Sequence, residues 1–158
     1  MSSAIPPNPR SSPADGELVI TRVFNAPRHL VFRAWTSAEH QRHWLGPKDF
    51  TVESCEIDFR PGGTYRACIR SPEGIDYRMR GTYREIVASE RLVFSFSWDE
   101  EGERGLETVV TVIFADEDGM TRLTFHQAPF QSVGERDGHH GGWSECFERL
   151  AAYVARAA

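Results

Sequence analysis

The residues with the clearest capacity for chemistry are three histidines in the last quarter of the chain, His126, His139 and His140. A neutral imidazole near pH 7 can act as a general base or can hold a polar group of a ligand. His139 stands four residues before Trp143, so in a helix both would project from the same face. His139 is therefore the candidate polar group of a site, unless it only satisfies a local hydrogen bond or faces solvent.

These histidines do not form a metal-binding pattern with Cys146. Zinc sites usually take paired ligands spaced as CxxC or HxxxH, and neighbouring residues of a helix do not face a common point. The sequence has no GxSxG motif, and Gly62-Gly63 and Gly141-Gly142 lie outside the strand–loop–helix units that bind phosphate. We therefore predict no metal and no cofactor, and motifs identify no catalytic residue.

A long C-terminal helix must position His139. Ser132-x-x-Glu135 is a capping-box signature for its start. Four apolar residues then follow at i, i+4, i+7 and i+11, which is one face of an α-helix: Trp143, Phe147, Leu150 and Val154. The pattern predicts an amphipathic helix that runs almost to the C-terminus.

Three glycines interrupt the first part of that helix, at 138, 141 and 142. In a regular helix they would cost about 3 kcal/mol relative to alanine. Either they serve a function, through close approach of a ligand or as a hinge, or the helix becomes regular only near Trp143. The sequence leaves both interpretations open.

Period-two patterns separated by turn residues predict strands in most of the remaining chain. They cover residues 18–24, 50–59, 64–70, 77–87, 91–98, 107–115 and 121–127. Two short helices are expected between the first two strands, one begun by Pro27 and the other capped by Ser37 and ending near Trp44. The short connections between the later strands predict an antiparallel meander.

Side chains alternate clearly along the third, fourth and fifth predicted strands. The residues of one face are Tyr65, Ala67, Ile69, Tyr77, Met79, Gly81, Tyr83, Leu92, Phe94, Phe96 and Trp98, and those of the other include Arg66, Arg70, Arg78, Arg80 and Arg84. The arginine face is either solvated and paired with glutamates or a positive patch for an acidic partner. The sixth strand is apolar on both sides, so its inner face cannot be assigned.

The aromatic face and the long helix have to meet, because the helix can hide its apolar stripe only against the sheet. The fold class is therefore α+β, with a curved antiparallel sheet wrapped around a C-terminal helix. A strongly bent sheet and a helix leave an internal cavity lined by aromatic side chains, unless those side chains fill the space as an ordinary core.

Composition limits the classes of partner. The chain has 158 residues, a formal net charge of −5 and 40% hydrophobic residues, which predicts one domain over 17–158 and no nucleic-acid partner. Residues 1–16 are rich in Pro and Ser and read as a disordered tail without signal-peptide character. No apolar run is long enough to span a membrane, and an odd number of cysteines favours reduced thiols in the cytoplasm. Whether the chain forms a homodimer stays open.

Five motifs resemble bacterial proteins of the activator of Hsp90 ATPase homologue 1-like family, within the START-like (Bet v 1-like) superfamily. They are FNAP with VFxAW at 24–35, HWLGP at 43–47, DxRPGGTY at 58–65, GxYxEI at 81–86 and GWxxxFxxL at 142–150. The resemblance implies a helix-grip fold with a cavity. It does not imply one function, because the superfamily includes lipid and hormone binders, cyclases and chaperone activators.

The leading hypothesis is a binding module for a small, largely apolar molecule of aromatic, polyketide-like or lipid-like character. The candidate ligand contacts are Trp44, Tyr65, Tyr83, Phe94, Phe96, His139, Trp143, Phe147 and Leu150. One alternative is a cyclase, aromatase or hydrolase that uses His139 or a tyrosine as acid or base. A second is a chaperone-associated or other protein-interaction module that uses the arginine face. An enzyme is the less favoured interpretation.

Overall fold

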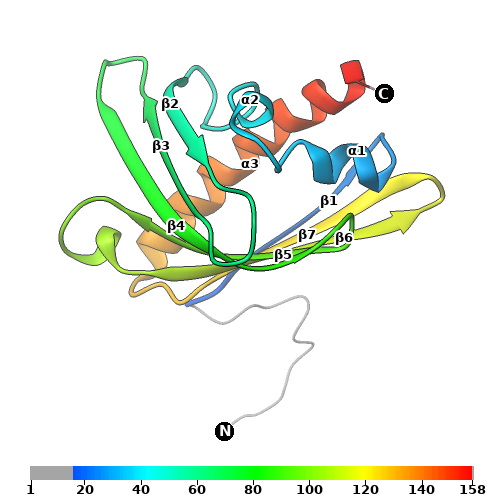
Figure 1. Ribbon diagram of the computed structural model, residues 1–158. Coiled ribbons are helices and arrows are strands. Elements are labelled where there is room, and N and C mark those ends of the chain that lie inside the picture. The colour runs from blue at the N-terminus through cyan, green and yellow to red at the C-terminus, as the bar shows by residue number, and fades with distance from the viewer. Residues whose placement is uncertain (1–15, 158) are drawn as a thin grey trace, which may run out of the picture.

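Seven antiparallel strands curve around one long helix in the computed structural model, which describes residues 16–157 (Figure 1). The chain begins with β1 (Leu18–Phe24), α1 (Arg28–Arg33) and α2 (Ala38–Gln41). The following strands are β2 (Thr51–Ile57), β3 (Thr64–Arg70), β4 (Asp76–Val87), β5 (Arg91–Trp98), β6 (Thr108–Glu117) and β7 (Met120–Ala128), and α3 (Val133–Ala157) ends the chain. The predicted α+β helix-grip architecture is confirmed.

The sheet has the order β1-β7-β6-β5-β4-β3-β2, so the first strand pairs with the last and the others form a meander. Irregularities of register between Val52 and Ser54 and between Tyr83 and Glu85 lie in the β2–β3 and β4–β5 pairs. Such bulges increase the local twist and bend a strand, which helps the sheet to curve.

The predicted inner and outer faces are those of the structure. Most inner residues of β3 to β5 are buried, whereas Tyr77, Gly81 and Trp98 are half-buried. Val110, Val112 and Phe114 are also buried, which settles the inner face of β6. On the outer face, arginines pair with carboxylates, as in the contacts of Arg66 with Glu56 and of Arg70 with Asp76. Arg78 and Arg84 also have acidic partners. This pairing is what a solvated sheet face requires.

The helix α3 lies across the concave side of the sheet (Figure 1). Ser132 caps it, because its Oγ accepts a hydrogen bond from the backbone N–H of Glu135 at 3.1 Å. Its apolar stripe is buried as predicted: Trp143, Phe147, Leu150 and Val154. The helix is regular from Val133, so the interpretation in which it becomes regular only near Trp143 is wrong.

The turns that follow the two short helices place Trp35 and Trp44 in the core, where the centroids of their rings lie 4.8 Å apart. Ser37 caps α2 by accepting from the N–H of His40 at 3.2 Å. Hydrogen-bonded turns continue the helical path from Gln41 to Leu45, so α2 itself is shorter than predicted. Among residues 16–157, no helix combines the length and apolar character that crossing a membrane requires.

The disordered tail predicted for residues 1–16 lies outside the described residues, except for Gly16.

Candidate functional site

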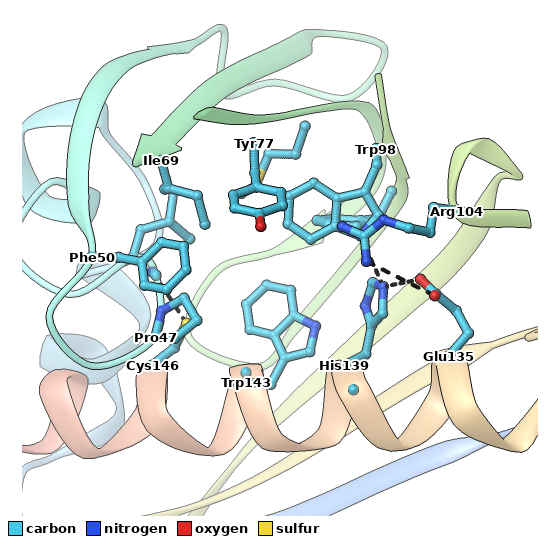
Figure 2. Close-up of a pocket in the computed structure, with 16 residues that line it drawn as sticks. Pro47, Phe50, Ile69, Tyr77, Trp98, Arg104, Glu135, His139, Trp143 and Cys146 are labelled. Carbon is cyan, nitrogen blue, oxygen red and sulfur yellow. Dashed lines mark hydrogen bonds and ion pairs between the residues drawn. The ribbon is translucent and has the colours of Figure 1, made fainter. Parts of the chain in front are cut away.

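A cavity of about 250 Å³ lies beside the first half of α3 and the loop 45–50 (Figure 2). Its other wall is formed by the end of β3, the start of β4 and the end of β5. Five aromatic side chains form much of its wall: Phe50, Tyr77, Phe96, Trp98 and Trp143. It exceeds the ~150 Å³ of an engineered cavity that binds benzene, and it is slightly smaller than the range of about 300–1,000 Å³ for ligand pockets. Its size therefore suits a compound of one or two rings.

Two glycines of α3 keep this space open. Gly138 and Gly142 both line the cavity and stand one helical turn apart. A Cβ added to Gly138 would meet no atom within 4 Å, and one added to Gly142 would lie 3.8 Å from Pro47 Cγ. Because these positions have no side chain, the helix does not cover the aromatic wall opposite. Gly141 is exposed and lies outside the cavity.

His139, Trp98 and Glu135 meet at one end of the cavity (Figure 2). The indole Nε1–H of Trp98 donates to Nε2 of His139 at 2.9 Å, and Glu135 Oε2 lies 3.0 Å from the same nitrogen. An indole N–H only donates, so Nε2 must be the acceptor and His139 carries its proton on Nδ1. An ionised Glu135 would then place two acceptors against each other. The contact with Nε2 is therefore favourable when Glu135 is protonated, whereas an ionised Glu135 needs a nearby cation such as Arg104, whose Nη1 lies 3.9 Å away.

The electrostatics agree with a neutral His139. Burial, followed by the charge of Arg104, lowers the pKa of His139 to about 4, so the imidazole is neutral near pH 7. Burial raises the pKa of Glu135, and the nearby carboxylates of Glu103 and Glu100 raise it further, against the opposing effect of Arg104. This end of the cavity therefore disfavours both a positive charge on His139 and a negative charge on Glu135.

Arg104 lies beside this group on the short 3₁₀ helix Glu103–Gly105 between β5 and β6. Its guanidinium carbon is 5.0 Å from the ring centroid of Trp98 and 5.8 Å from that of Tyr77. Its Nε donates to Glu100 at 3.0 Å, and its Nη1 is 3.9 Å from Glu135. The Arg104 side chain thus lies on aromatic faces at the rim of the cavity.

The loop 45–50 forms the opposite end and is fastened to α3. Nη1 of Arg149 donates to the carbonyl oxygens of Leu45, Gly46 and Pro47 at 3.2, 3.0 and 3.1 Å. Gly46 has φ of 101° and donates its N–H to Cys146 Sγ at 3.2 Å. Burial raises the pKa of the Cys146 thiol to about 12, so this cysteine is not a nucleophile at neutral pH.

A buried chain of hydrogen bonds fixes the ring of Trp143. Its Nε1–H donates to Gln127 Oε1 at 3.0 Å, and Gln127 Nε2 donates to Thr108 Oγ1 at 2.8 Å. Thr108 Oγ1 in turn donates to the carbonyl oxygen of Phe96 at 3.0 Å. These hydrogen bonds join α3 to β7, β6 and β5, so the sheet sets the orientation of the Trp143 ring in the cavity wall.

The predicted contact residues fall into three groups. His139, Phe96 and Trp143 line the cavity. Trp44, Tyr65, Tyr83 and Phe94 instead line a second space of about 20 Å³, also bounded by Phe96 and Trp143, with room for about one water molecule. Phe147 and Leu150 are fully buried in the core and line neither space. The aromatic residues predicted from the sequence thus divide between cavity and core.

The two buried tyrosines of that second space are poor candidates for acid–base chemistry. Burial is the main cause that raises the pKa of both Tyr65 and Tyr83, so both stay neutral phenols. The hydroxyl of Tyr65 donates to the carbonyl oxygen of Ser95 at 2.7 Å. Within residues 16–157, no three His, Cys, Asp or Glu side chains gather in a way that could hold a metal ion.

Sequence reasoning missed several lining residues: Phe50, Tyr77, Trp98, Arg104 and Glu135. The alternation along β4 and β5 placed Tyr77 and Trp98 on the aromatic face but gave no reason to select them. Glu135 was assigned to a capping box, whereas its carboxylate contacts His139. The spacing of Glu135 and His139, four residues apart on a helix, is the signal that could have paired them.

The family model for activator of Hsp90 ATPase homolog 1-like protein matches residues 25–155, which include both ends of the cavity. The chain belongs to this family. A solved structure from Chromobacterium violaceum is 26% identical with a TM-score of 0.79, and the match covers 88% of this chain and 96% of that one. A structure from Rhodobacter sphaeroides is 24% identical with a TM-score of 0.80, covering 93% and 97%.

A third solved structure, of the AHSA1 protein from Silicibacter pomeroyi, is 22% identical with a TM-score of 0.78, and the match covers 90% of this chain and 99% of that one. These likenesses establish the fold. No curated protein matches the sequence of this chain closely enough to indicate a relationship. The START-like fold of the family commonly binds hydrophobic ligands.

Proposed function

We propose that this family member binds a small, largely apolar ligand of one or two rings in the cavity beside α3. The observation that carries the proposal is a space of about 250 Å³ walled by five aromatic side chains and bearing polar groups at one end. Apolar walls with a few convergent polar groups are typical of ligand sites. A ring packed against such walls gains about 0.5–1.5 kcal/mol per aromatic pair beyond the burial of its area.

The volume of the cavity narrows the choice of ligand. A one- or two-ring compound matches it better than a fused multi-ring polyketide or a long lipid chain. His139 and Glu135 supply hydrogen-bonding groups at one end, while Phe50 and Ile69 make the other end apolar. The ligand therefore carries its polar group toward the first turn of α3.

A pair of glycine variants tests this function, with naphthalene as the probe. Gly142→Leu extends a side chain into the cavity, whereas Gly141→Leu places the same side chain on the exposed face of the helix. A ligand at 100 times its Kd stabilises the folded protein by about 2.7 kcal/mol, which thermal unfolding detects. We expect naphthalene to stabilise the wild type and Gly141→Leu but not Gly142→Leu.

Both substitutions replace a helical glycine and so gain about 0.5–1 kcal/mol of helix propensity. Loss of binding in Gly142→Leu therefore cannot be attributed to unfolding, provided that its unfolding midpoint without ligand is at least that of the wild type. Equal stabilisation of both variants by naphthalene would place any binding site elsewhere. Native mass spectrometry of the purified protein would also reveal a copurified ligand and decide whether the chain is a homodimer, which stays a prediction.

One observation favours a second function, catalysis of proton transfer on a bound aromatic compound. Glu135 and His139 form a hydrogen-bonded acid and base pair inside the cavity, with Oε2 and Nε2 3.0 Å apart. Turnover of a candidate substrate that is lost in both Glu135→Gln and His139→Gln would support an enzyme. A ligand recovered chemically unchanged would support binding. Either activity fits a cytoplasmic protein with three free, buried cysteines, and that location is part of the proposal.

A further inference from the structure

The polar end of the cavity lies in a region rich in carboxylates. The turn 99–105, with the sequence DEEGERG, has four acidic residues and one arginine, Arg104. Glu135 adds a further carboxyl group, which lines the cavity itself and is largely shielded from solvent, with a side-chain exposure of 12%. A ligand that enters past this turn therefore meets a negative field, which attracts cations and repels anions.

The position of Arg104 shows that a cation already fits against this wall. Its guanidinium lies on the faces of Trp98 and Tyr77, within the ~6 Å at which a ring face attracts a positive charge. The same side chain contacts Glu100 and Glu135. One end of the cavity thus offers aromatic faces and a carboxylate together, which is a combination suited to an organic cation.

The surroundings of Glu135 disfavour a further negative charge. Burial and the carboxylates of Glu103 and Glu100 raise the pKa of Glu135, so even its own carboxylate is poorly stabilised there. An anionic ligand would meet the same unfavourable field, and Arg104 already has two carboxylate partners. A cationic ligand would instead favour the ionised form of Glu135 and offset its charge.

We infer that the ligand of this cavity is an organic cation, an amine or quaternary ammonium carried on one aromatic ring, held between the aromatic walls and the carboxylate of Glu135. The inference rests on the proposed binding function and specifies its ligand class. Arg104 competes for the same rings and carboxylate. It can turn toward solvent and keep Glu100 as its partner, because both residues belong to the same short turn.

Three probes of similar size distinguish the charge that the cavity prefers. Phenyltrimethylammonium and tert-butylbenzene have nearly the same shape and differ by one positive charge, and benzenesulfonate supplies the anion. Binding is followed by the fluorescence of Trp98 and Trp143, which line the cavity. We expect the cation to bind about tenfold or more tightly than its neutral isostere, which corresponds to one charge-assisted contact of ordinary strength. Benzenesulfonate should bind weakest.

Two variants assign the preference to this end of the cavity. Glu135→Gln should weaken binding of phenyltrimethylammonium about tenfold and leave tert-butylbenzene unchanged, since only the charge is removed. Arg104→Gln should strengthen binding of the cation, because it removes a competing positive charge. Glu101→Gln is the matched control, since Glu101 belongs to the acidic turn but does not line the cavity; it should leave the cation affinity within about twofold.

Equal or tighter binding of tert-butylbenzene than of phenyltrimethylammonium would overturn the inference and leave the proposed binding function intact. Weaker cation binding in Arg104→Gln would also overturn it, because Arg104 would then act as a ligand contact and not as a competitor. Failure of all three probes overturns the inference as well. In that case the naphthalene titrations of Gly142→Leu and Gly141→Leu decide separately whether the cavity binds apolar molecules.

Discussion

Replacing His139 by glutamine should make the protein less sensitive to mild acid. His139 is 9% exposed, and its neighbours at the end of the cavity hold it as a neutral imidazole. Glutamine keeps an oxygen that can accept from the Trp98 indole N–H but has no group that titrates. The comparison therefore isolates the proton that His139 takes up when the protein unfolds.

The size of the effect follows from the two pKa values. Folding lowers the pKa of His139 from 6.5 to about 4. Between these values the unfolded chain binds more protons than the folded one, so stability is present above pH 6.5 and is lost as the pH falls toward 4. At pH 5 the loss relative to pH 7.5 amounts to about 2 kcal/mol.

Glu135 contributes with the opposite sign. Its pKa is raised on folding, so its contribution to stability falls as the pH rises above its ordinary value of 4.5. This carboxyl group is present in both the wild type and His139→Gln. It therefore cancels to a first approximation when the two proteins are compared at each pH.

Urea denaturation of both proteins between pH 7.5 and pH 5 measures the difference. We expect the wild type to lose about 2 kcal/mol more than His139→Gln over this range, or about 1 M in urea midpoint for a typical m-value. The m-values should stay equal, since the variant changes no large surface. If the stabilities of the two proteins run parallel within about 0.5 kcal/mol, burial does not lower the pKa of His139 and the reasoning is refuted.

Three further substitutions test the packing around the cavity. Phe147→Ala should cost about 3–5 kcal/mol in urea denaturation, since this fully buried ring contacts four aromatic neighbours and lies outside the cavity; a loss below 1 kcal/mol would contradict its core position. Gln127→Leu should cost about 2 kcal/mol, because the Trp143 indole N–H loses its buried acceptor; unchanged stability would refute that account. Gly81→Ala should prevent stable folding, since its Cβ would lie 1.9 Å from the Ser95 carbonyl oxygen. Gly141→Ala, whose Cβ meets no atom within 4 Å, should instead raise the free energy of unfolding by up to about 1 kcal/mol. Equal melting curves for the two variants by circular dichroism would contradict both expectations.

The strands and their faces could be predicted because the sheet alternates with period two and turn residues mark its ends. Tyr83 and Phe94 were placed on the inner face from this pattern alone, and both are buried. The pattern failed at β6, where Val109 and Val110 are both apolar and only pairing with β5 and β7 determines which one points inward. Local alternation carries no information where both faces are apolar.

The position of the cavity could not be predicted, because it depends on residues brought together from distant parts of the chain. Phe50 was predicted as the first residue of a strand but lies in the loop before β2, and Arg104 comes from a short acidic turn outside any periodic pattern. The role of Glu135 in the cavity could not be predicted for a different reason. Its local signature predicts a cap, and Ser132 does cap the helix, but a tertiary contact with His139 determines where the carboxylate lies.

One helix packs in two ways along its length, and this separates the residues that hold the fold from those that face a ligand. In the second half of α3, Phe147, Leu150 and Val154 are fully or almost fully buried against the sheet. In the first half, Gly138 and Gly142 provide no side chain to meet Tyr77 and Trp98 across the gap, and the cavity results.

Substitutions of Gly138 and Gly142 can change which molecule fits without weakening the core, because the new side chains extend into open space. The second half lacks that freedom, since each large side chain there is surrounded by others. This division gives a physical reason why membership of the family establishes the fold of this chain, whereas its ligand has to be argued from Glu135, Arg104 and the rings around them.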